Sequence, residues 1–125
     1  MDETEVRRIA DAWIELCRLP EGSAERDAHF WAFVRLSELV RDAPETAWQV
    51  ITAIWQRDSS EVLLANLAAG PMEDLLALHG GWFIDRIETL ARKEPIFKKL
   101  LGGVWKSDIA DEVWRRIQAV AGPSF

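Results

Sequence analysis

The stretch from Val62 to Gly81, VLLANLAAGPMEDLLALHGG, constrains the fold of this chain more than any other part of it. A nearly all-apolar helical segment is followed by a Gly-Pro pair, a second helical segment that begins with acidic residues, and a His-Gly-Gly end. Apolar residues at helical spacing on both sides of the Gly-Pro pair predict two buried helices that meet at a turn. The stretch therefore fits either an architectural role or a functional site.

The same helical period runs through nearly the whole chain, and strand-like alternation is absent. We expect an all-α single domain of seven or eight short amphipathic helices, as an irregular bundle or a short helical-repeat-like stack. The expected helices cover residues 3–19, 24–41 with Ser23 as cap, 44–57, 60–69, 72–79, 82–93, 95–101, and about 109–120 with Ser107 or Asp108 as cap.

A weak internal repeat supports the stack. At an offset of 33 residues, five positions recur, with Ile51, Ile54, Leu64, Leu67 and Gly70 aligning with Ile84, Ile87, Phe97, Leu100 and Gly103. The period is within the range of helical repeat proteins, but amphipathic helices alone could also produce it.

Composition excludes several classes of function. The net charge is −6, with 12 acidic and 7 basic residues in the first 60 positions, which argues against nucleic acid and anionic membranes as partners. No apolar run reaches the roughly 18 residues of a membrane span, and the acidic start does not resemble a signal peptide. The single cysteine, Cys17, fits a reducing compartment. We expect a cytoplasmic protein.

Three separated blocks carry a family resemblance: LLANLAAGPMEDLLALHG, then FIDRIE at 83–88, then LLGGVW at 100–105. Together they resemble an uncharacterised bacterial family of domains of unknown function with an NLAAGP(L/M)EDLL core. The resemblance covers about residues 48–117, with residues 1–43 as an N-terminal helical extension. It implies a bacterial helical domain and supplies no activity, cofactor or catalytic residue.

The first candidate site is formed by Glu73, Asp74 and His79, because paired carboxylates beside an imidazole can do acid–base work or hold a metal ion. The competing interpretation is helix capping. Glu73 and Asp74 would complement the start of a helix after Pro71, and His79 would lie in its last turn before a left-handed Gly80.

Three more polar residues extend this candidate cluster. Asn66 is the one strongly polar side chain in an apolar helix, so we expect it to be buried and either to pin a neighbouring helix or to line a pocket. Asp85 and Arg86 follow on the next helix, where Arg86 could reach back to Glu73 or Asp74 as a structural or ligand-binding network.

Metal and cofactor motifs are absent. His29 lies four residues after Glu25, but two ligands do not make a metal site, and there is no phosphate-binding glycine loop. We therefore predict no cofactor and no metal. Residues 89–107 carry a net charge of +4, which indicates either an anion-binding patch or cations at helix ends.

Tryptophans suggest an interface. Phe30, Phe33, Val34, Ser37 and Val40 fall on one face of their helix, which we expect to face the core. Trp31 and Trp114 fall at the edges of their apolar faces, where a half-exposed indole acts as an interface anchor or a core lid. We predict a non-catalytic interaction module that binds an unidentified protein or a second copy of itself. An inhibitor-like or immunity-like role is one version, and an enzyme or small-ligand domain built on the acidic, His and Arg cluster is the alternative.

Overall fold

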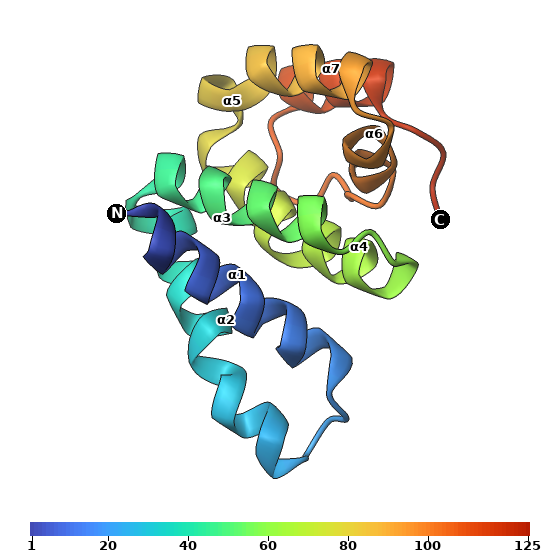
Figure 1. Cartoon of the computed structure of the whole chain (residues 1–125). Coiled ribbons are helices and arrows are strands. Elements are labelled where there is room, and N and C mark those ends of the chain that lie inside the picture. Colours follow the sequence, from blue (N-terminus) through green and yellow to red (C-terminus); the bar gives the residue numbers. More distant parts are fainter. The chain divides into compact units, whose positions relative to one another are not determined.

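A computed structural model describes residues 1–125, and its secondary structure is entirely helical (Figure 1). The elements are α1 (Glu3–Arg18), α2 (Ala24–Asp42), α3 (Pro44–Arg57), α4 (Glu61–Leu67), the π-helical turn η1 (Ala68–Met72), α5 (Glu73–Lys93), α6 (Pro95–Gly102) and α7 (Asp111–Val120). The all-α prediction is confirmed. The chain forms two compact units, residues 1–63 and 64–125, and α4 crosses the boundary between them.

The first unit contains α1, α2 and α3, each of which packs against the other two. In Figure 1, α1 and α2 lie side by side and run in opposite directions. Both helices have a side-chain N-cap. The Asp2 side chain accepts a hydrogen bond from the backbone N–H of Glu5, and the Ser23 side chain accepts one from the backbone N–H of Arg26. The predicted ends of α1 to α3 agree with the structure to within a residue or two because Pro20, Ser23 and Pro44 punctuate the sequence.

In the second unit, α5 packs against η1, α6 and α7, and α6 also contacts α7. The Arg116 guanidinium on α7 reaches both Glu88 and Asp85 on α5, with Nη2–O distances of 2.6 Å to each carboxylate. These two ion pairs join α7 to α5 at the surface. They form in place of the ion pairs within one helix, Glu88–Arg92 and Glu112–Arg116, that helical spacing favours.

The Gly-Pro pair does not end a helix, contrary to the prediction. Gly70 and the buried Pro71 lie inside η1, and helical backbone continues through them from Glu61. At His79 the backbone is non-helical (φ −135°, ψ 20°), so α5 consists of two helices that meet at a kink, close to the predicted break between residues 79 and 82. A π-helical turn accommodates the proline ring and its missing N–H without breaking the chain direction. The joined run reduces the helix count to six, below the predicted seven or eight.

The last helix also begins later than predicted. Its N-cap is Ala110, which makes no side-chain capping bond, while Ser107 adopts a left-handed conformation (φ 41°) in the preceding loop. Ile109, expected on the helix, lies just before it and is buried. The repeat has unequal copies, since Gly103 caps the end of α6 whereas Gly70 lies within η1.

The buried side chains are apolar, with no charged or strongly polar residue among them. Eight of the ten repeat positions, the isoleucines, leucines and Phe97, are in this core. No helix of the chain combines the length and the apolar character that crossing a bilayer requires.

Candidate functional site

Glu73 and Asp74 do not cap a free helix end, because η1 runs directly into α5 at their position. The residue before them, Met72, has αR backbone angles and no capping bond, so the backbone N–H groups there are already inside a continuous helical run. Glu73 is half-buried and accepts a hydrogen bond from Ser107. Burial and the nearby Asp74 and Asp108 charges raise its pKa, and the Ser107 hydrogen bond only partly offsets them. Desolvation also raises the pKa of Asp74.

The other cluster residues have separate surroundings. Asn66, predicted to be buried, is exposed, because α4 turns that side of its apolar sequence outward. His79 is half-buried at the kink of α5. Asp85 contacts Arg116, and the exposed Arg86 guanidinium lies 4.8 Å from the centre of the buried Phe83 ring.

No group of three or more His, Cys, Asp or Glu side chains is placed to share a metal ion. His29 contacts the backbone carbonyl oxygen of Glu25, through Nδ1 at 2.8 Å, rather than its carboxylate. Burial raises the pKa of the Cys17 thiol to about 11, so at neutral pH this side chain is an unreactive thiol. The acidic, His and Arg cluster stays a prediction, and it lines none of the grooves described below.

Trp31 is half-buried beneath a side chain from the neighbouring helix. The Arg8 guanidinium lies 4.4 Å from the centre of its ring, and Glu5 holds Arg8 through two hydrogen bonds of 3.0 and 3.1 Å. Cation–π stacking of this kind favours Arg over the ring face. The Glu5–Arg8–Trp31 stack therefore joins α1 to α2 and covers the indole that was predicted as an anchor.

The outward face of α2 carries exposed apolar side chains. Phe30, Phe33 and Val34, predicted to be core residues, are 49%, 44% and 44% exposed, and the two phenylalanine rings stack with centroids 5.3 Å apart. We call these three residues the α2 apolar surface. The buried face of α2 consists of Ala32, Leu36, Leu39 and Val40, and of these only Val40 was on the predicted face.

The misassignment has a physical cause. The sequence of α2 contains two apolar stripes at helical spacing, and periodicity alone does not say which one faces the core. The stripe with Ala32 and Leu36 allows close approach to α1 and α3, since Ala32 is small. The bulkier aromatic stripe remains outside, and the smaller side chains of the buried stripe were the one signal that could have identified it.

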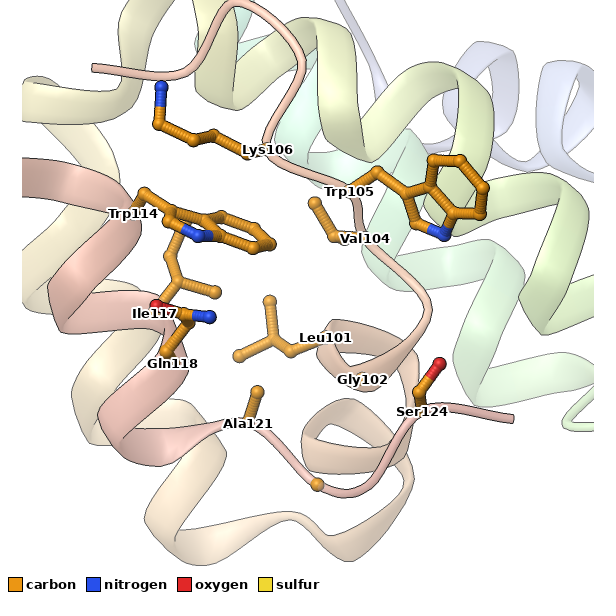
Figure 2. A pocket seen from close by; sticks show the side chains of 11 residues that line it. Leu101, Gly102, Val104, Trp105, Lys106, Trp114, Ile117, Gln118, Ala121 and Ser124 are labelled. Atoms are coloured by element: carbon orange, nitrogen blue, oxygen red, sulfur yellow. The ribbon is translucent and has the colours of Figure 1, made fainter. Parts of the chain in front are cut away.

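The second predicted anchor, Trp114, is half-buried and lines a groove between α6, the loop before α7, α7 and the C-terminal segment (Figure 2). We call this the α6–α7 groove; its volume is about 470 Å³. Leu101, Val104 and Ile117 supply a buried apolar floor. Trp105, which also lines the groove, is 75% exposed, and Figure 2 shows its indole pointing outward.

Gly102 and Gly103 make one wall of this groove possible. A Cβ at Gly102 would lie 2.3 Å from the Pro123 carbonyl oxygen, and one at Gly103 would lie 2.8 Å from the Phe125 ring. The Gly122 N–H donates to the Lys98 carbonyl oxygen at 3.0 Å. These contacts hold the C-terminal segment against α6, a role beyond the helix stop that the glycine pair predicts.

The first unit has two adjoining grooves between α1 and α3, both of which include Glu3, Val6, Ala53 and Gln56. Thr52 lines the larger one, and its buried hydroxyl has no hydrogen-bond partner in the protein. These grooves contain no arrangement of side chains that matches a reaction type.

Comparison of the chain with curated proteins and with solved structures finds no match. A family model matches residues 20–124, a longer span than the stretch from 48 to 117 that carries the signature blocks. The match begins before α2 and includes α2, α3 and every element of the second unit. The chain therefore belongs to the family of unknown function DUF6869.

Proposed function

We propose that this protein is a non-catalytic interaction module that pairs with a second copy of itself through the α2 apolar surface. The observation that supports it is the exposure of Phe30, Phe33 and Val34 on one face of a well-capped helix. Adjacent exposed apolar side chains on one helix face can bury their surface by packing against a partner. A bacterial cytoplasmic setting agrees with the single, protonated Cys17.

Charge favours a second copy as the partner. Asp27, Val34 and Arg41 are seven residues apart along α2 and so lie on one stripe. When two copies of α2 pack in opposite directions about Val34, Asp27 of each copy faces Arg41 of the other. Both residues are exposed, so the stripe is complementary to itself, as a two-fold interface requires.

The small exposed area of the α2 apolar surface indicates that the dimer is weak. The exposed parts of the three side chains amount to roughly 250 Å² per copy, given the size of aromatic residues. A standard stable interface buries about 800 Å² per partner. The rest would come from the flanking polar residues of α2, so we expect an equilibrium between monomer and dimer that depends on concentration.

Sedimentation equilibrium over a wide range of protein concentration tests this proposal. The natural protein should approach the dimer mass as concentration rises. Phe33→Glu should remain monomeric, because it introduces a charge at the centre of the α2 apolar surface without altering the core.

Leu78→Glu is the matched control, since Leu78 is 59% exposed on α5, away from α2 along the chain. It should dimerise like the natural protein. A natural protein that is monomeric at every concentration, or equal dimerisation by Phe33→Glu, would overturn the proposal. Circular dichroism melting confirms that both variants are folded.

A further inference from the structure

We propose that the α6–α7 groove is a binding site for a small aromatic carboxylate. It is separate from the α2 apolar surface and does not depend on self-association. The lining combines an apolar floor with a few polar groups, which is the usual character of small-molecule sites.

The aromatic wall favours a flat ring. Trp114 is on α7, and its indole lines the groove together with Leu101 and Val104 (Figure 2). Leu101 and Val104 are almost fully buried, so the floor of the groove is part of the packed core. A planar ring can stack on the indole and cover the floor at the same time, which gains both aromatic contact and apolar burial.

Three hydrogen-bond donors line the groove. They are the Trp114 indole N–H, the Gln118 amide and the Ser124 hydroxyl. Figure 2 shows the Trp114 indole nitrogen and the Gln118 side chain on the same wall. All three groups can donate a hydrogen bond, so they suit a ligand rich in acceptor oxygens.

Charge points to an anion. Lys106 lines the groove, and Lys98 and Lys99 lie on the neighbouring α6, in the basic run from 89 to 107. The Lys106 ammonium contacts Asp111 at 2.9 Å, but the Asp111 side chain is 93% exposed. A solvent-exposed pair of this kind contributes little, so Lys106 can turn from Asp111 to a bound carboxylate.

The test uses naphthalene-2-carboxylate as the probe and records the indole N–H signals of the full chain by ¹H–¹⁵N NMR. The Trp114 signal, identified by its loss in Trp114→Phe, should shift in a saturable way. The Trp82 signal should not shift, because Trp82 lies on α5 outside the groove lining. Naphthalene-2-methylammonium, the cation of similar shape, should bind more weakly.

Three variants test separately how charge and open space in the α6–α7 groove contribute to binding of the probe. Lys106→Gln should weaken binding of the carboxylate several-fold, and Asp111→Asn, which frees Lys106, should strengthen it by about two- to three-fold, the scale of an exposed ion pair. Ala121→Leu should abolish binding by filling the groove, because Ala121 lines it. Melting curves check that each variant is folded.

Absence of a saturable shift at Trp114 would overturn the proposal. So would equal shifts at Trp114 and Trp82, which would indicate nonspecific adsorption. Unchanged affinity in Ala121→Leu would place the probe elsewhere. Equal binding of the carboxylate and the ammonium would overturn the anionic class of ligand.

Discussion

At the scale of single residues, two adjacent glycines that look identical in the sequence have different roles. Gly80 and Gly81 were expected to end a helix together, with Gly80 in the left-handed region. The break is present, as a kink at the non-helical His79, but Gly80 is not left-handed, and Gly22 is the one glycine with a positive φ. A Cβ at Gly80 would lie 2.9 Å from Val113 Cγ1, whereas one at Gly81 would meet nothing within 4 Å. Gly80 is therefore required by the close packing of α7 on α5.

This difference predicts opposite effects of the same substitution. Gly80→Ala should lower the free energy of unfolding by about 1–3 kcal/mol, the usual cost of overpacking. Gly81→Ala should raise it by about 0.4–1 kcal/mol, because alanine restricts the unfolded chain and fits the helix. Urea denaturation measures both. Val113→Ala in the Gly80→Ala background should recover part of the loss, and a neutral Gly80→Ala would contradict the packing.

At the scale of elements, Arg116 is the polar connection between α7 and α5. Its hydrogen bonds lower the pKa of the Glu88 carboxyl below the ordinary value of 4.5. Glu88 is 19% exposed, whereas Glu112, the partner of Arg115 on the same helix, is 68% exposed. The connection between helices is thus better shielded from water than the pair within α7.

We predict that Arg116→Met lowers the free energy of unfolding at pH 7 more than Arg115→Met does. Because the folded pKa of Glu88 is lowered, its stabilisation is present above the unfolded value and is lost as the pH falls through the folded value. The difference between the natural protein and Arg116→Met should therefore shrink toward acid pH. Thermal melts from pH 7 to pH 3 measure it, and a difference independent of pH would show that Arg116 acts through its aliphatic packing alone.

At the scale of the whole molecule, each compact unit carries one candidate binding feature. The first has the α2 apolar surface and the second has the α6–α7 groove, and the family match includes both. Neither feature uses the acidic, His and Arg cluster. In the proposed dimer the two copies of α2 are antiparallel. Asp27 of one copy meets Arg41 of the other only in this orientation.

Charge exchange tests that orientation. Asp27→Lys and Arg41→Glu should each weaken self-association, because each places like charges opposite one another. The double variant, which carries both changes, should recover it. Sedimentation equilibrium at low and high salt measures the effect, and salt should reduce it. A double variant no stronger than either single variant would exclude the antiparallel register.

Much of the fold could be predicted because local chemistry decides it. Pro44 and Pro95 begin their helices as expected, and Ser23 caps α2. Predictions were wrong where the local sequence allows two backbone conformations. Pro71 could end a helix or enter a π-helical turn, and the residues next to it in the sequence do not distinguish the two. The candidate sites were partly anticipated: Trp114 lines a groove, whereas Trp31 is covered by Arg8.

Residues close together along the chain are enough to predict that this protein is helical, where most of its helices begin and end, and which family signature it carries. The outward-facing stripe of α2 and the need for glycine at position 80 were visible only in the folded chain, because they depend on contacts with other helices. The continuation through Gly70 and Pro71 was also visible only there, because the sequence permits both a helix end and a π-helical turn. Close packing selects among conformations that local preferences leave nearly equal in energy.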